Sequence, residues 1–161
     1  MFARSFIACC AAAVLAVGCS SQPQPESEPA SKSVEMRDGY VKAMADDAKM
    51  TGIFGTVTNH SDKDVTIVGF EADVKAGSYE VHEVVDGKMK EKEDGLTIPA
   101  GQTTVMEPGS YHLMLMDVPT PIKAGDNVAV TLKLDDGSTV AVGDLPVRTI
   151  ASGEENYSSH N

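Results

Sequence analysis

One short segment, YHLMLMDV at residues 111–118, carries a histidine and two methionines at alternate positions. If this segment is a strand, successive side chains point to opposite faces, so Leu113 and Leu115 lie on one face and His112 and Met114 on the other. The leucine face is an ordinary core face. The other face is unusual for the outside of a β protein, and it predicts either methionine filling a core or a soft metal site.

A second pair of the same kind lies upstream. His82 and Met89 are separated by six residues that include Asp-Gly at 86–87, the strongest short-range signal for a tight β-hairpin. Twenty-two further residues lead to His112, and one more separates it from Met114. Two imidazoles and two thioethers suit Cu(I), whereas Mg²⁺ and Ca²⁺ prefer oxygen and Zn²⁺ usually recruits cysteine or carboxylate as well.

The elements that would position these residues are strands. Short segments with β-branched residues or alternating polarity lie at residues 50–59, 64–72, 78–85, 103–109, 111–118, 127–134 and 138–147. A second Asp-Gly pair lies between the last two. A helical period is only weakly suggested, around Val41 to Lys49. The sequence therefore predicts an all-β fold, a single antiparallel β-sandwich domain.

The length, cysteine content and charge of the chain exclude several classes of fold, metal site and partner. A chain of 161 residues suits one ordinary domain. Its three cysteines, Cys9, Cys10 and Cys19, all lie near the N-terminus, so a metal site in the domain has no thiolate. The net charge of -11 argues against nucleic acid and against adsorption to anionic lipid.

The first residues are typical of a secretory signal. Arg4 precedes a short apolar segment, and AVGC before Ser20 resembles a bacterial lipobox. We expect a signal peptide at 1–18 and a lipid-modified Cys19 that anchors the chain to the outer face of the cytoplasmic membrane. Ordinary cleavage, giving a freely secreted protein, is the alternative.

The rest of the chain divides by composition. Residues 19–36 are rich in Pro, Ser and Glu and are expected to form a flexible tether. The β-sandwich domain is expected at 37–147, and the last residues, 148–161, are expected to form a flexible tail.

The segment GLTIPAGQTTVMEPGSYHLMLMDVPTPIKAGDNVAVTLKLDDGSTVAV, with GYVKAMADDAKMTGIFGTVTNHSDKDVTIVG and SYEVHE upstream, resembles the PCuAC family of extracytoplasmic copper chaperones. The resemblance implies a cupredoxin-like β-sandwich that binds one Cu(I) through His82, Met89, His112 and Met114. It also implies delivery to the binuclear copper centre in subunit II of cytochrome c oxidase, directly or through a Sco-type thiol chaperone.

One spacing departs from the family. Six residues separate His82 from Met89, where the family usually has about ten, so the first hairpin is expected to be shorter. If Met89 points away from the site, Met116, Met50 and Met106 are the reserve thioethers.

Other polar residues lie near these ligands or could bind copper elsewhere. Glu80 and Glu83 flank His82 and are expected to be solvated surface carboxylates, although either could orient the imidazole or receive Cu(II). His60 and His160 are further candidates for Cu(II).

Several alternatives remain at this stage. The protein is expected to be a monomer and not an enzyme, since the sequence holds no catalytic triad, phosphate loop or paired-carboxylate motif, and a blue-copper site needs a cysteine. A lipoprotein that sequesters Cu(I) without delivering it would use the same residues. A purely structural surface lipoprotein is the third interpretation.

Overall fold

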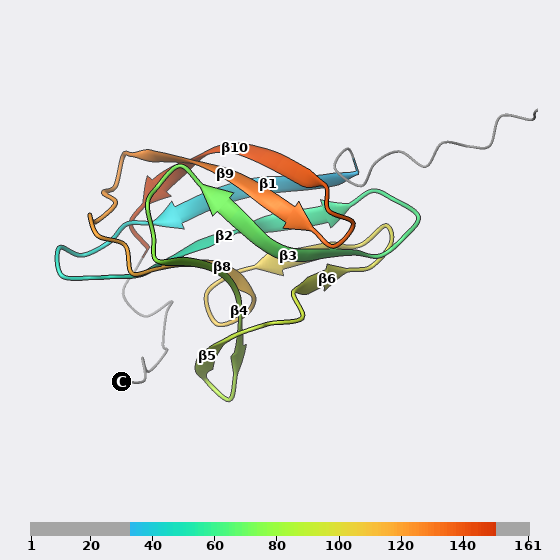
Figure 1. The fold of residues 1–161 in the computed structure, drawn as a ribbon, viewed down its shortest axis with the longest axis horizontal. Helices are drawn as coiled ribbons and strands as arrows, with labels where there is room; N and C mark the ends of the chain where they lie inside the picture. Colours follow the sequence, from blue (N-terminus) through green and yellow to red (C-terminus); the bar gives the residue numbers. More distant parts are fainter. Residues whose placement is uncertain (1–32, 151–161) are drawn as a thin grey trace, which may run out of the picture.

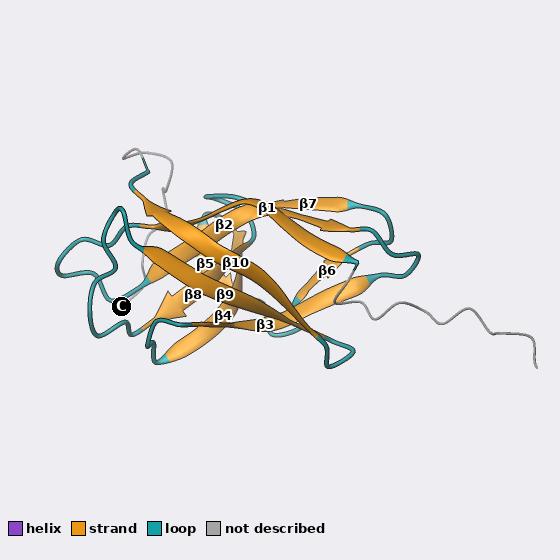
Figure 2. Cartoon of the chain, turned by 90° about the horizontal axis from the view of Figure 1, so that it is seen from above, coloured by secondary structure: helices purple, strands orange, loops and turns teal. Residues whose placement is uncertain are grey.

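The computed structural model describes residues 33–150, which fold into ten β-strands joined by turns and loops (Figures 1 and 2). No helix occurs among these residues. The strands are β1 (Val34–Lys42), β2 (Thr51–Asn59), β3 (Val65–Ala72), β4 (Ser78–Val85), β5 (Lys88–Glu91), β6 (Leu96–Ile98), β7 (Thr103–Met106), β8 (His112–Met116), β9 (Asn127–Leu134) and β10 (Thr139–Arg148).

The strands form one continuous sheet in the order β5-β4-β8-β2-β1-β10-β9-β3-β6, with β7 paired to β2 beyond the end of β8. Every described pairing is antiparallel except that of β1 with β10. The sheet folds over on itself, so that β3, β9 and β10 make one layer and β2, β4 and β8 the other (Figure 1). The tip of the β4–β5 hairpin projects beyond the two layers (Figure 1).

The core lies between the two layers. Ile53 of β2 and Leu113 of β8 belong to the same buried cluster as Ile67 of β3 and Leu132 of β9, and all four side chains are fully buried. Alternate residues of these strands supply the cluster, because a strand with one buried face shows a period of two. The predicted all-β class and the two-layer arrangement are confirmed.

The seven predicted strand segments all contain strands, and both Asp-Gly pairs lie in hairpin turns. Three further strands, β1, β5 and β6, were not predicted. β5 reads KMKE, an exposed edge with little apolar alternation, and β6 has only three residues. β1 is interrupted by a register shift between Arg37 and Tyr40, where Asp38 has a positive φ of 53°. Such a bulge disturbs the alternation on which the prediction depends.

Two expectations differ from the structure, one about where the domain begins and one about a helix. The domain was expected to begin at residue 37, but β1 begins at Val34. Val34 pairs with Asn59, and the pairing of β1 with β2 continues from there. The weak helical period around Val41 to Lys49 was wrong, since those residues finish β1 and continue as loop and turn. The expected signal peptide and most of the tether, with residues 151–161 of the tail, lie outside the described residues.

Candidate metal centre

Strand β8 has two faces, and both are buried. Leu113 and Leu115 are fully buried in the core, whereas His112 and Met114 lie on the opposite face and are only 1% and 5% exposed. The predicted alternation is confirmed, but the second face is covered instead of open to solvent. Part of the cover is Phe54 of β2, whose ring centroid lies 5.7 Å from that of His112.

The two histidines are direct neighbours across two strands. In the β4–β8 pairing His82 lies opposite His112, and directly opposed residues point to the same face of a sheet. Their ring centroids are 5.6 Å apart, and His82 is 7% exposed. The structure therefore brings together two imidazoles that are thirty positions apart in the sequence.

A tight hairpin adds the first methionine. Asp86 and Gly87 connect β4 to β5, and their positive φ angles of 53° and 73° are those of a two-residue type I′ turn. In the resulting register Met89 lies opposite Val84, two residues beyond His82. Met89 is therefore on the same face as His82, as the hairpin signal in the sequence predicts.

These side chains border a cavity of about 150 Å³ that opens on this face. Met89, His112 and Met114 line it, whereas His82 does not line it and neighbours His112 edge to face. The other lining residues are Lys42, Met50, Thr51, Gly52 and Phe54. Three of the four predicted ligands thus line one cavity, Met89 among them, and the fourth, His82, neighbours the ring of His112.

His82 presents one particular ring nitrogen to the site. Its Nε2 lies 2.7 Å from Oε2 of Glu80, and a carboxylate can only accept, so Nε2 carries the hydrogen. The other nitrogen, Nδ1, then holds the lone pair. This atom is buried and has no hydrogen-bond partner among the residues that the structure describes.

His112 is oriented differently. Its Nδ1 lies 3.0 Å from the carbonyl oxygen of Ser110, which can only accept, so Nδ1 donates and Nε2 holds the lone pair. Burial lowers the pKa of His112, and the effect exceeds the opposing one of the Ser110 hydrogen bond. Both histidines therefore carry a lone pair suited to a metal ion when they are neutral.

A row of rings crosses the sheet beside the cavity. Tyr40 of β1 lies 5.4 Å from Phe54, centroid to centroid, and Phe54 continues the row to His112 and His82. The ring of Phe54 lies over Gly52, where a Cβ atom would come within 2.7 Å of its Cζ. The absence of a side chain at Gly52 thus leaves room for this ring.

Two charged groups border the site. Burial opposes ionisation of Glu80, but hydrogen bonds from Ser78 and His82 outweigh it, and the pKa of this carboxyl lies below its usual value. On the other side of Met114, partial burial lowers the pKa of Lys42. Glu80, Met114 and Gly52 share one row across β4, β8 and β2.

The reserve thioethers have different places. Met50 lines the cavity and is 38% exposed. Met116 ends β8 and does not line the cavity, and Met106 is 1% exposed in the core beyond the register of the site. Met50 is therefore the only one of the three that borders the described cavity.

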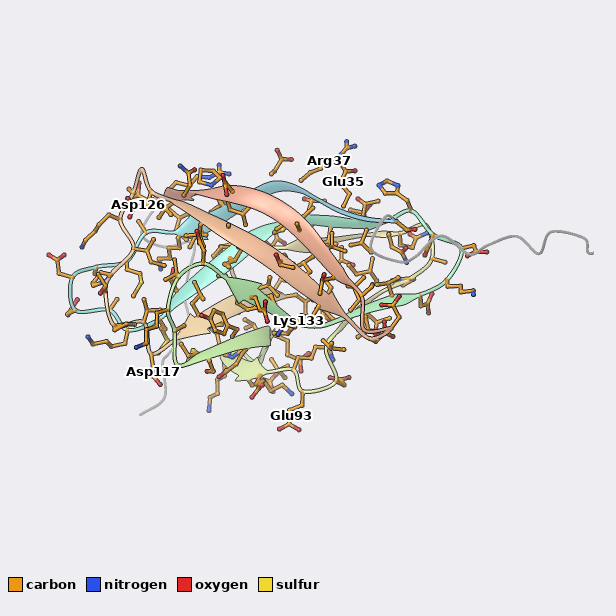
Figure 3. All side chains as sticks on the ribbon, turned by 45° about the horizontal axis from the view of Figure 1, so that its top comes forward. Glu35, Arg37, Glu93, Asp117, Asp126 and Lys133 are labelled. Carbon is orange, nitrogen blue, oxygen red and sulfur yellow. The ribbon has the colours of Figure 1, made fainter. Side chains whose placement is uncertain are left out.

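The other polar candidates lie apart from the cavity or face away from it. Glu83 is paired with Lys90 at 3.1 Å and, one residue after His82, points to the opposite face. His60 follows β2 and lies 3.2 Å from Glu35. Figure 3 shows Glu35 far from Asp117, which follows β8 directly. His160 lies outside the described residues.

Some functional neighbours were missed or misjudged from the sequence. Glu80 was expected to be solvated, with orientation of the imidazole as the alternative, and the structure shows the alternative, since Glu80 binds His82. Their spacing of two within one strand, which puts both side chains on one face, was the available signal. The sequence gives no signal that places Phe54, Gly52 and Lys42 at the cavity. These residues border it only because β1 pairs with β2 and β2 pairs with β8.

One common kind of metal site is lacking in the described part of the chain. No group of three or more His, Cys, Asp or Glu side chains is placed to hold an ion within residues 33–150. The donors that gather at the cavity are thioethers and imidazoles. In the same part of the chain, no helix has the length and apolar character needed to cross a membrane.

Comparison with known proteins places this arrangement in a family. Residues 34–147 match the family model described as "Putative lipoprotein LpqE-like". The chain belongs to this family. The LpqE-like chain is also 37% identical over 128 residues, 77% of its own length and 75% of the relative's, to "Putative lipoprotein Lxx21020" of Leifsonia xyli subsp. xyli.

Solved structures share its fold. The Cu(I) form of DR1885 from Deinococcus radiodurans is similar with a TM-score of 0.61 and 28% identity, covering 80% of this chain and 85% of that one. The copper-bound PCuAC domain of PmoF2 matches with a TM-score of 0.60 and 19% identity, covering 73% and 94%. The resemblance to the PCuAC family and the predicted cupredoxin-like β-sandwich are confirmed.

Proposed function

We propose that this LpqE-like lipoprotein binds one Cu(I) through His82, Met89, His112 and Met114 and acts as an extracytoplasmic copper chaperone. The observation that carries the proposal is the pairing of His82 with His112 beside a cavity that both methionines line. Copper-bound forms of two proteins with the same fold support the choice of ion.

The donor set explains why Cu(I) is favoured. Neutral thioethers and imidazoles are soft or borderline ligands, and thioethers do not form disulfides in an oxidising compartment. The carboxylate that binds His82, Glu80, is engaged by Ser78 at one oxygen and by His82 at the other. It therefore does not supply the hard oxygen ligand that Zn²⁺ or Mg²⁺ would use.

Transfer is a ligand exchange. The bonds from copper to the two thioethers and the two imidazoles break as bonds to acceptor thiolates form, and the metal remains Cu(I). Each acceptor thiol loses its proton to solvent before it binds. Met89 is only partly buried and Met50 is 38% exposed, so an acceptor can approach from the thioether side of the cavity.

The proposed acceptor is the binuclear copper centre in subunit II of cytochrome c oxidase, reached directly or through a Sco-type thiol chaperone. A lipid on Cys19 would hold the protein at the outer face of the cytoplasmic membrane. The segment between Cys19 and β1 would then raise the effective concentration of the site near such a membrane-bound partner.

A Cu(I) titration against a chromogenic competitor tests binding. The wild type should bind one equivalent, and Met114→Ala and Met89→Ala should each weaken it by more than the roughly 10- to 100-fold that loss of an outer partner costs. Met116→Ala is the matched control, since this residue lies on the same face of β8 outside the cavity. Absence of a tight equivalent in the wild type would refute the proposal.

A gene deletion tests delivery. Loss of oxidase activity that added copper restores would support delivery to the oxidase. Sensitivity to copper with normal oxidase activity would instead indicate sequestration through the same four residues.

A further inference from the structure

We propose that Glu80, held in place by Ser78, is a positioning residue that makes His82 bind Cu(I) through Nδ1 while His112 binds it through Nε2. The inference rests on the proposed function, because it concerns how the same four residues hold the ion. It gives the two histidines unequal roles and assigns a selectivity function to a carboxylate that does not itself touch the metal.

The first step is the tautomer of His82. The distance of 2.7 Å between Nε2 and Oε2 of Glu80 is that of a strong, charge-assisted hydrogen bond. With the hydrogen on Nε2, Nδ1 is the only ring atom left to bind a metal. This Nδ1 is also a buried atom without a hydrogen-bond partner among residues 33–150, on a side chain that is 8% exposed. A buried polar atom left in this way is costly unless something binds it.

The second step is the contrast with His112. Here a backbone carbonyl, that of Ser110, fixes the hydrogen on Nδ1 at 3.0 Å and leaves Nε2 as the donor. The ring planes of the two histidines are inclined at 62° and their centroids are 5.6 Å apart. Two residues that face each other across the strands thus offer different nitrogens, each fixed by a partner of its own.

The third step is the consequence of using a carboxylate for one histidine and a carbonyl for the other. A carboxylate behind an imidazole raises its basicity and fixes the rotation of its ring. Its negative charge also offsets the single positive charge that Cu(I) brings to four neutral ligands. His82 should therefore be the stronger of the two nitrogen donors.

The last step is the role of Ser78. Its hydroxyl donates to Oε1 of Glu80, while Oε2 accepts from His82, so both oxygens are occupied. Released from Ser78, Oε1 could turn toward the metal and add a hard oxygen to the ligand set. Ser78 thus keeps the carboxylate behind His82 and keeps the site selective for Cu(I) over Zn²⁺.

Histidine NMR tests the tautomers directly. In a long-range ¹H–¹⁵N correlation spectrum of the apo protein, His82 should carry its hydrogen on Nε2 and His112 on Nδ1. Addition of Cu(I), which is diamagnetic, should shift Nδ1 of His82 and Nε2 of His112. A hydrogen on Nδ1 of His82, or a copper-induced shift centred on its Nε2, would overturn the inference.

Two matched variants test the consequence. Glu80→Ala should weaken Cu(I) binding about 10- to 100-fold. Glu83→Ala should leave it within about twofold, since Glu83 is equally exposed at 21%, is also paired, and faces away from the site. Equal affinities of the two variants would overturn the role of Glu80. Binding of no Cu(I) by the wild type would refute the proposed function instead, and the tautomers of the apo protein would still be measured.

Ser78→Ala tests the selectivity. The variant should bind Zn²⁺ more tightly than the wild type does and Cu(I) no more tightly. A Zn²⁺ affinity equal to that of the wild type would show that Ser78 does not restrain the carboxylate.

Discussion

Replacing Gly52 with alanine should disturb both stability and copper binding, for a reason that the geometry makes explicit. A Cβ atom at this position would lie 2.7 Å from Cζ and 2.9 Å from Cε2 of Phe54, whereas ordinary contacts begin at 3.4 Å. The ring of Phe54 would have to move by about 0.7 Å, and it is bordered by Tyr40 and His112. Its displacement therefore changes the cavity or presses on His112.

The expected size of the effect follows from overpacking in a well-filled site. Forced displacement of a buried side chain costs about 1–3 kcal/mol, which we expect as a lower free energy of unfolding of Gly52→Ala in urea. If about 1.4 kcal/mol of this strain is felt at His112 and Met114, Cu(I) affinity falls about tenfold. The same competitor titration that tests copper binding would measure it.

Gly69→Ala is the matched control. This glycine is also in a strand, β3, but a Cβ atom there meets nothing within 4 Å. It should leave the affinity unchanged and alter stability by less than about 1 kcal/mol. A second substitution, Phe54→Leu, should reduce the effect of Gly52→Ala, because it removes the atoms that clash. Full affinity and stability in Gly52→Ala would refute the reasoning.

Three further outcomes are expected. Burial lowers the pKa of His112, so this imidazole takes up a proton near pH 6.5 in the unfolded chain and only at lower pH in the folded apo protein. The free energy of unfolding of the apo protein should therefore fall as the pH drops below 6.5. A titration of the His112 ring by NMR should give a pKa below that value. Gly87→Ala places a side chain at a φ of 73° and should cost about 1 kcal/mol in urea unfolding, with weaker Cu(I) binding because the hairpin that carries Met89 loosens. Asn59→Ala removes an amide that donates to the carbonyls of Lys63 and Ile98, so it should lower the free energy of unfolding by about 3 kcal/mol and leave copper affinity unchanged, as urea unfolding and a copper titration would show.

Local patterns in the sequence were sufficient for most of the fold. Alternating residues such as those of β8 and β9 predict strands, because a half-buried strand has a period of two. The Asp86-Gly87 pair predicts a turn whose φ angles the structure reproduces. From these two features alone, His82 and Met89 could be placed on one face and His112 and Met114 on another.

Features that depend on pairing between distant strands were not predictable in this way. The sequence does not show that β4 lies beside β8, so it could not show that His82 faces His112. It also could not show that Phe54 covers the histidine and methionine face of β8, so a buried face and an exposed metal site could not be told apart. The short edge strand β5 was missed because its exposed lysines and glutamate leave no apolar period.

The β4–β5 hairpin separates the position of Met89 from the length of the loop that carries it. Met89 lies opposite Val84, below the turn, and the residues between this rung and the tip only carry the hairpin outward. Adding one residue to each strand lengthens the hairpin by a rung and leaves the thioether opposite the same partner. The hairpin can thus change length at its tip while Met89, at its base, stays in register with Val84.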